Sequence, residues 1–214
     1  MDTISKLIEQ FRQFPGIGPR QAKRFVYFLL GQNDPYREQL SRLVLDLKKQ
    51  IRVCQSCFRF FPLGVKISDE CVICADSGRL ESTLLVVSRD VDFEHIEKSH
   101  MYEGKYFILG GSVPILEKNP ETRVRAKELL ILIENRAQQA DKGQNALKEV
   151  ILAFNLTPEG EHTQFFIEGL LGPLVAKYGL IVSTLGRGLS TGLELEYSDS
   201  ETVKNALRGR QHSR

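Results

Sequence analysis

The 214-residue sequence contains no tryptophan, only four cysteines and two methionines. It also lacks any apolar run that approaches the roughly 20 residues needed to span a bilayer. The first residues, Met1 to Ile4, do not combine a basic segment with an apolar stretch, so they do not resemble a secretory signal. We therefore expect a cytoplasmic protein without membrane association, a setting in which structural disulfides are rare.

The sequence also contains no G-x-x-x-x-G-K-[ST] phosphate loop, so ATP hydrolysis by this chain alone is not expected. Hydrophobic residues make up 42% and charged residues 26%, which is ordinary for a globular protein. A length of 214 residues allows one large domain or two to three small ones.

The charge is distributed unevenly along the chain. Residues 1–66 hold 12 Lys/Arg and 5 Asp/Glu, a net charge of +7, whereas residues 67–214 hold 17 and 22, a net charge of −5. The positive charge of residues 1–66 favours a polyanionic partner such as nucleic acid. A solvated basic face without a ligand would show the same charge, so this alternative stays open.

Residues 1–50 predict three helices. Apolar residues recur at helical spacing from Ile4 to Phe11, from Ala22 to Leu30 and from Leu40 to Ile51. Asp34-Pro35 is typical of an N-cap followed by proline at the first helical position.

From residue 80 onward, short apolar segments alternate with amphipathic ones, which predicts an α/β domain with a parallel sheet covered by helices. The predicted strands are 84–87, 105–109, 150–154 and 180–183, and the predicted helices are 122–139 and 161–177. Near the end, Glu194-Leu195-Glu196-Tyr197 predicts a last, edge-type strand. Ser198-Asp199-Ser200-Glu201 has the spacing of a capping box that opens a terminal helix.

All four cysteines fall in one pattern, Cys54-x2-Cys57-x13-Cys71-x2-Cys74. Two CxxC pairs separated by a short loop favour tetrahedral zinc. The alternatives are two disulfides, which the cytoplasm disfavours, or a redox pair, which needs one CxxC opening a helix. Four thiolates leave no open coordination position, so we expect one structural Zn²⁺ per chain in place of a missing hydrophobic core.

The segment Pro15-Gly16-Ile17-Gly18-Pro19 lies between two predicted helices. Its glycines allow the main chain to approach a phosphate, and the helix that starts at Pro19 offers free N–H groups to an anion. This layout is typical of a helix-hairpin-helix motif, which grips a nucleic-acid backbone without reading bases. A turn that only packs two helices is the alternative. The predicted DNA-binding residues are Gly16, Gly18, Arg20, Lys23 and Arg24.

Taken in order, these features resemble the bacterial recombination mediator family RecR along essentially the whole chain. The matching segments are 14–20, the cysteine pairs with 73–79, 106–111, 150–155, 159–161 and 193–197. The resemblance implies a helix-hairpin-helix DNA-binding domain at 1–52, a four-cysteine zinc finger at 53–78, a Toprim domain at 79–176 and a C-terminal segment at 177–214 with a Walker-B-like strand and a helix.

The resemblance also implies a function in DNA repair and recombination after DNA damage. Family members form rings, commonly homotetramers, that encircle single- or double-stranded DNA without sequence preference. They act with RecO and RecF to help load RecA onto single-stranded DNA in the bacterial cytoplasm, in association with the nucleoid. Arg20 and Arg24 match basic positions used for DNA contact, and Glu159 and Glu161 correspond to acidic residues implicated in partner contact.

The chain departs from the family pattern at three places. Ser88 follows the first Toprim strand, where the family commonly has glutamate, and 155–161 and the turn at 187–192 also differ. Toprim enzymes need a glutamate and an Asp-x-Asp pair to hold magnesium, so we expect no catalytic residue here.

Two alternatives remain. One is a Toprim-type, magnesium-dependent nuclease or primase-like enzyme that uses Asp90, Asp92, Glu159 and Glu161. The more ordinary interpretation of Asp90 and Asp92 is a helix N-terminus, where carboxylates are favoured. The other alternative is a scaffold whose zinc finger binds only protein.

Overall fold

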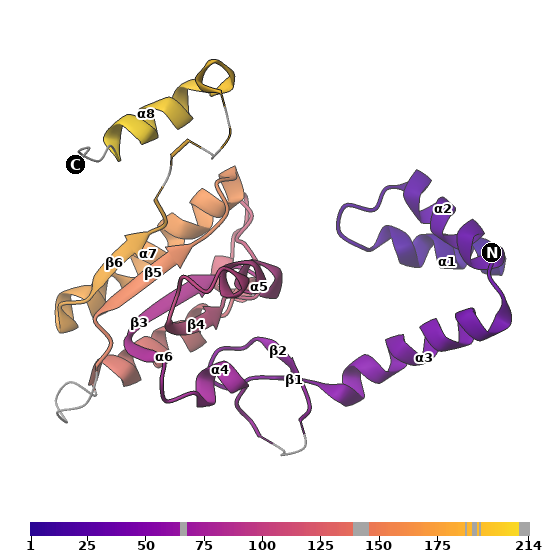
Figure 1. The fold of residues 1–214 in the computed structure, drawn as a ribbon, viewed down its shortest axis with the longest axis horizontal. Helices are drawn as coiled ribbons and strands as arrows, with labels where there is room; N and C mark the ends of the chain where they lie inside the picture. Colours follow the sequence, from indigo (N-terminus) through magenta and orange to yellow (C-terminus); the bar gives the residue numbers. More distant parts are fainter. Residues whose placement is uncertain (65–67, 139–145, 187, 190–191, 193, 210–214) are drawn as a thin grey trace. The chain divides into compact units, whose positions relative to one another are not determined.

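The fold was obtained as a computed structural model, which describes residues 1–64, 68–138, 146–186, 188–189, 192 and 194–209 (Figure 1). The chain divides into two compact units, Met1–Arg52 and Val53–Arg214. No helix among the described residues is both long and apolar enough to cross a membrane.

The first unit consists of α1 (Thr3–Arg12), α2 (Pro19–Leu30) and α3 (Asp34–Gln50), which confirms the three predicted helices. The predicted cap of α3 is wrong by one residue. Asn33 is the N-cap, and its Oδ1 accepts a hydrogen bond from the Tyr36 backbone N–H at 3.0 Å. Asp34 is instead the first helical residue, where its carboxylate favours the positive end of the helix dipole.

Little of the first unit is buried. Ala22 and Val26 of α2 are buried, whereas α1 and α3 contain no buried residue. The apolar stripe predicted on α3 therefore lies at the surface, with Leu43, Val44 and Leu47 each about 60% exposed. A groove of ≈ 670 Å³ with mainly apolar walls runs between the three helices. This much contiguous apolar surface is typical of a protein–protein contact.

Strand β1 (Ile51–Val53) crosses the boundary between the units. The second unit begins with the cysteine-bearing segment, which contains β2 (Phe60–Pro62) and the short helix α4 (Val72–Ala75). A four-stranded parallel sheet follows, in the order β4-β3-β5-β6. Its strands are β3 (Leu80–Val87), β4 (Gly104–Ile108), β5 (Glu149–Ala153) and β6 (Ile181–Thr184). The predicted α/β fold with a parallel sheet is confirmed.

Two apolar clusters pack on opposite faces of this sheet, because alternate residues of a strand point to opposite sides. Leu84 and Val86 of β3 join one cluster with α6 (Ala126–Ala137) and α7 (Pro158–Tyr178). Leu85 and Val87 join the other with Phe93 of α5 (Asp90–Lys98) and the cysteine segment. The cysteine segment is thus part of the core of the second unit.

Other described elements of the second unit are the 3-10 helices η1 (Pro120–Thr122) and η3 (Leu195–Tyr197) and the helix α8 (Ser200–Arg208). The predicted edge strand at 194–197 is wrong. The Tyr197 N–H donates to the Glu194 carbonyl at 3.1 Å, a local bond of the 3-10 helix η3. Arg187, Ser190, Thr191 and Leu193, in the divergent turn and the Walker-B-like segment, lie outside the described residues.

The predicted terminal helix is confirmed as α8, but its cap differs from the prediction. Asp199 Oδ1 accepts a hydrogen bond from the Thr202 N–H at 2.9 Å, and Asp199 Oδ2 accepts one from the Thr202 hydroxyl at 2.6 Å. Asp199 therefore occupies the capping position that the spacing assigned to Ser198, because an aspartate at the N-cap satisfies the free N–H groups of the first turn.

Candidate metal centre and nucleic-acid interface

The four cysteines of the predicted pattern come together at one point. The sulfurs of Cys54, Cys57, Cys71 and Cys74 all lie within 4.8 Å of one another, and those of Cys57 and Cys71 are 3.7 Å apart. Zn–S bonds of about 2.3 Å in a tetrahedron place the sulfurs about 3.8 Å apart. The cluster can therefore hold a metal ion, and its spacing and ligand type are suited to zinc.

Local backbone structure aims these sulfurs at a common centre. In the first CxxC turn, the Phe58 N–H donates to the Cys54 carbonyl and the Cys54 N–H donates to the Arg59 carbonyl, both at 2.9 Å. Phe58 takes a left-handed backbone conformation, φ +62°, which closes the turn. The Cys71 N–H donates to the Cys54 sulfur at 3.3 Å and links the two CxxC turns.

Closeness and burial make it costly to ionise all four thiols. Hydrogen bonding with the Cys54 sulfur, followed by the other thiols and burial, raises the pKa of Cys57 above its ordinary value. A cation at the centre reverses this effect, because coordination stabilises the thiolate.

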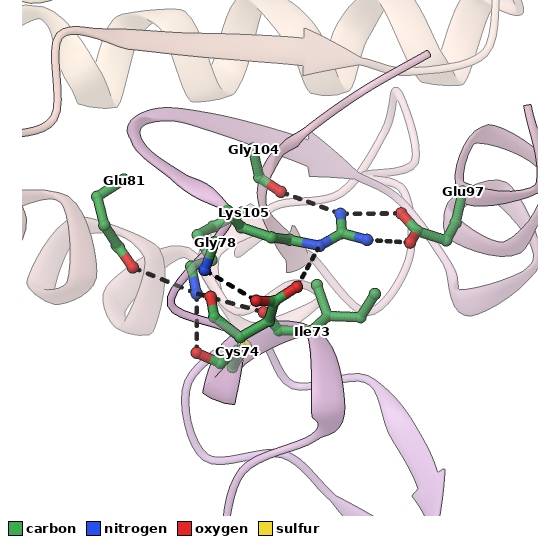
Figure 2. A network of polar contacts seen from close by, with 9 residues as sticks. Ile73, Cys74, Gly78, Glu81, Glu97, Gly104 and Lys105 are labelled. Carbon is green, nitrogen blue, oxygen red and sulfur yellow. Dashed lines mark hydrogen bonds and ion pairs between the residues drawn. The ribbon is translucent and has the colours of Figure 1, made fainter. Parts of the chain in front are cut away.

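Both CxxC turns are attached to the edge strand β4. The Ile108 N–H donates to the Cys57 carbonyl at 2.8 Å. The Lys105 ammonium, almost fully buried, donates to the carbonyls of Cys74 at 2.8 Å, Asp76 at 2.7 Å and Ile73 at 3.3 Å (Figure 2). Glu81 Oε1 lies 3.2 Å from the same nitrogen and supplies the balancing charge.

A second cation ties the end of this segment to α5. Arg79 forms a two-pronged ion pair with Glu97 and donates to the Gly104 carbonyl at 3.3 Å. Figure 2 shows Glu81 and Glu97 at opposite ends of this network, with Gly104 between them. Neither Lys105 nor Arg79 was predicted to have a role, although Lys105, at the start of the apolar run 105–109, is a signal of a partnered buried charge.

The predicted hairpin between α1 and α2 is present. Gly16 lies at φ +75°, a conformation that other residues resist, and the Ile17 N–H donates to the Phe14 carbonyl at 3.1 Å. Gly18 is the N-cap of α2, and no side chain caps this helix. Its first N–H groups therefore remain open to an anion.

The predicted cations lie together beside this helix end. Arg20, Lys23 and Arg24 are exposed and follow one another at helical spacing, on the side of α2 opposite the buried residues Ala22 and Val26. Within the part of the chain that the structure describes, none of the three forms an ion pair. The structure thus brings together the five residues predicted to contact DNA: Gly16, Gly18, Arg20, Lys23 and Arg24.

The residues of the enzyme alternative lie near the carboxyl edge of the sheet. Asp90 Oδ1 accepts a hydrogen bond from the Phe60 N–H at 2.8 Å, and Asp92 Oδ2 accepts one from the Arg89 N–H at 3.0 Å in the capping box of α5. Both residues lie in the first turn of α5, where Asp92 caps the helix and Asp90 instead binds the backbone of β2. Ser88 is buried, and its hydroxyl has no hydrogen-bond partner among the described residues.

Glu159 and Glu161 occupy the first turn of α7, where Glu159 is exposed and Glu161 is partly buried. Thr163 fixes this turn, because its hydroxyl donates to the Glu159 carbonyl at 2.6 Å and accepts from the Val113 N–H at 2.8 Å. Of the residues described, only the cysteine cluster gathers three or more potential metal ligands.

Comparison with known proteins agrees with both parts of this arrangement. A family model described as RecR, helix-hairpin-helix, matches residues 4–47, and a Toprim domain model matches residues 82–185. The first match covers the hairpin and the helices on either side of it. The second covers the parallel sheet from β3 to β6.

Relatives named recombination protein RecR match along nearly the full length. The chain is 35% identical to the protein of Pelotomaculum thermopropionicum, over 97% of this chain and 95% of the relative. It is 34% identical to those of Chloroflexus aurantiacus and Chlorobium phaeobacteroides, over 97% of this chain and 93% and 95% of the relatives. With its hairpin, its Toprim-type sheet and these relatives, the chain belongs to the RecR family of recombination proteins.

Proposed function

We propose that this protein is a recombination mediator that grips DNA without reading its sequence and carries no catalytic residue of its own. It acts with RecO and RecF to help load RecA onto gapped or single-stranded DNA. The observation that carries the proposal is the uncapped start of α2, next to three exposed cations without ion-pair partners in the described chain.

The proposed binding of DNA at the start of α2 is electrostatic. A phosphate bound at the start of α2 accepts hydrogen bonds from backbone N–H groups near Gly18, and Arg20, Lys23 and Arg24 supply positive charge. None of these groups depends on base identity, so binding is independent of sequence and weakens as salt rises.

The cysteine cluster holds one zinc ion per chain in this proposal. Cys54, Cys57, Cys71 and Cys74 fill the four positions of a tetrahedral ion, so the metal stabilises the fold and has no site for substrate. The fit of the sulfur spacing to zinc supports this role.

The protein assembles in this proposal as a homotetrameric ring at the nucleoid, in the bacterial cytoplasm. The exposed apolar stripe of α3 supports assembly, because burying Leu43, Val44 and Leu47 against another copy removes apolar surface from water. Glu159 and Glu161 at the start of α7 contact the partner proteins. Light scattering with and without DNA measures the mass of the assembly.

DNA-binding titrations over a range of salt concentrations test the grip. We expect Arg20→Ala and Arg24→Ala each to weaken binding equally across unrelated sequences and to lower the slope of log affinity against log salt by about 1. Arg42→Ala is the control, because Arg42 is also exposed, on α3, but is paired with Glu38 at 3.4 Å. Unchanged affinity in both test variants would exclude the hairpin as the DNA site.

The Toprim match favours one second candidate, a magnesium-dependent nuclease or primase-like enzyme. This candidate predicts that purified protein nicks plasmid DNA in magnesium and that Glu159→Gln abolishes the nicking. The mediator proposal predicts intact plasmid with both proteins.

A further inference from the structure

The outer face of α2 carries aromatic rings among its cations. Tyr27 follows Arg20, Lys23 and Arg24 at helical spacing, and its side chain is 54% exposed. The Lys23 ammonium lies 5.8 Å from the centre of the Tyr27 ring. Phe28, also 54% exposed, lies next to Tyr27 and packs edge-on against Tyr36.

These side chains line one shallow hollow on the surface of the first unit. It measures ≈ 620 Å³, and its walls are Arg20, Lys23, Arg24, Tyr27 and Phe28. Because α2 contains no acidic residue, nothing on the helix itself offsets the charge of the hollow. The hollow therefore combines positive charge with apolar ring surface.

We propose that this hollow is a single-strand site, in which a DNA base stacks on the Tyr27 ring while the cations hold the flanking phosphates. The inference rests on the proposed function and specifies the form of DNA that the site prefers. Interleaved aromatic and basic side chains are the arrangement by which proteins hold single strands without sequence preference.

The geometry of the helix fits one strand running along it. A rise of 1.5 Å per residue places Tyr27 about 10 Å beyond Arg20, along the axis away from the hairpin. A strand whose phosphate sits at the start of α2 can therefore bring a nearby base to the ring. Lys23 and Arg24 lie between these two points and can contact the backbone in between.

Preference for single strands follows from access to the bases. In a duplex, each base is already stacked on its neighbours and paired, so the Tyr27 ring has no face to contact. The cations contact phosphates in either form. The ring therefore adds affinity only for unpaired DNA, and the cations alone set the affinity for duplex.

The test compares wild-type full-length protein bound to three labelled DNAs of equal length, measured by fluorescence anisotropy. They are oligothymidylate, an abasic strand with the same phosphates, and a duplex. We expect oligothymidylate to bind at least about fivefold more tightly than the abasic strand. Equal affinity for these two strands would overturn the proposal, because their charges are the same.

Two substitutions assign the effect to the ring. Tyr27→Leu should remove the preference for oligothymidylate over the abasic strand and leave duplex binding unchanged, whereas Tyr27→Phe should retain it. Phe165→Leu is the control, because Phe165 is 69% exposed on α7 with Glu161 and Glu168 at neighbouring helical positions. A preference that survives Tyr27→Leu would overturn the assignment to this ring.

Failure of this inference can be told apart from failure of the proposed function. If stacking is absent but the grip is real, Arg20→Ala weakens binding to all three DNAs and the abasic strand binds as well as oligothymidylate. If the grip itself is wrong, Arg20→Ala and Arg24→Ala leave all three affinities unchanged.

Discussion

At the scale of single residues, the least expected feature is the buried Lys105 ammonium. It donates to the carbonyls of Ile73 and Cys74 in the second CxxC turn and of Asp76 just after it, and it pairs with Glu81, so its charge is compensated and its donors are used. A charge in this position is tolerated only because each of these partners is present. Lys105 thus positions the backbone that carries Cys74.

We predict that Lys105→Met lowers the free energy of unfolding by about 2 kcal/mol or more, since three carbonyls lose a charged donor and Glu81 loses its partner. It should also speed release of the zinc ion proposed for the cysteine cluster, followed with a chromogenic chelator. Lys98→Met is the control, because Lys98 is exposed at the end of α5. Equal effects of the two substitutions would contradict a positioning role for Lys105.

A second prediction concerns stability in alkaline solution. Burial raises the pKa of Tyr102 to about 12, and its hydroxyl donates to the Lys105 carbonyl at 3.0 Å. The folded state therefore keeps this proton where the unfolded chain, with a pKa near about 10, releases it. The stability that the protonated Tyr102 hydroxyl contributes to the folded state is complete below a pH of about 10 and is lost as the pH rises toward 12.

Chemical denaturation across this range checks the sign. The wild type should lose stability by at most about 1.4 kcal/mol per pH unit from this group, and Tyr102→Phe should flatten that part of the profile. If the free energy of unfolding of Tyr102→Phe falls as steeply with rising pH as that of the wild type, the loss of stability in alkaline solution belongs to other groups.

The functional residues that could be predicted from the sequence are those whose spacing along the chain indicates their chemistry. The cysteines and the hairpin cations were predictable because each set lies within a short segment that fixes its own geometry. Lys105 was not, because its partners Ile73, Cys74 and Asp76 lie about thirty positions earlier and meet it only through the fold. The role of Tyr27 also needed the structure, since helical spacing alone does not say which rings stay exposed.

At the scale of elements, α7 offers a direct test of how tightly its start is held. A Cβ at Gly160 would lie 2.0 Å from the Asn155 carbonyl oxygen, whereas a Cβ at Gly169 of the same helix would meet nothing within 4 Å. The two glycines therefore respond to alanine in opposite directions.

Gly160→Ala should destabilise the protein by at least about 2 kcal/mol, because the neighbouring atom is backbone and cannot move aside cheaply. Gly169→Ala should instead stabilise it by up to about 1 kcal/mol, since alanine is the better helix former. Urea unfolding of both variants measures the difference. Similar values would show that the turn at Asn155 is free to shift.

The elements that the sequence predicted well are those with strong periodicity. The strands from β3 to β6 and the helices from α1 to α3 fall where apolar spacing placed them. The segment 194–197 failed because alternation predicts a strand only where a neighbouring strand offers hydrogen bonds. The elements β1, β2 and α4 were not predicted, because short segments held by the cysteines or by tertiary contacts carry little periodic signal. For α5, the sequence indicated only a helix start, at Asp90 and Asp92.

At the scale of the whole molecule, the metal site and the sheet share one core. Cys54, Cys57 and Cys71 pack in the same cluster as Val87, Tyr106 and Ile108. Loss of the zinc ion proposed for this cluster should therefore loosen the second unit, whereas the first unit, Met1–Arg52, has its own contacts. The prediction is that chelation acts on one unit and spares the other.

Hydrogen exchange read by mass spectrometry, before and after treatment with a strong chelator, tests this division. Protection should fall in β1, β2 and β4 and stay unchanged in α1 and α2. Restored protection on adding zinc back should accompany restored unfolding midpoints. A uniform loss over both units would show that the two fold as one.

The hydrogen bond from the Ile108 N–H to the Cys57 carbonyl has a consequence for solubility. Since β4 is the edge strand of the sheet, its outward N–H and C=O groups could template strand addition by another chain. The first CxxC turn covers this edge of β4, because the Cys57 carbonyl accepts the hydrogen bond from the Ile108 N–H. If the cysteine cluster holds zinc as proposed, copies made in a cell starved of zinc would leave this edge of β4 uncovered and would tend to join one another edge to edge.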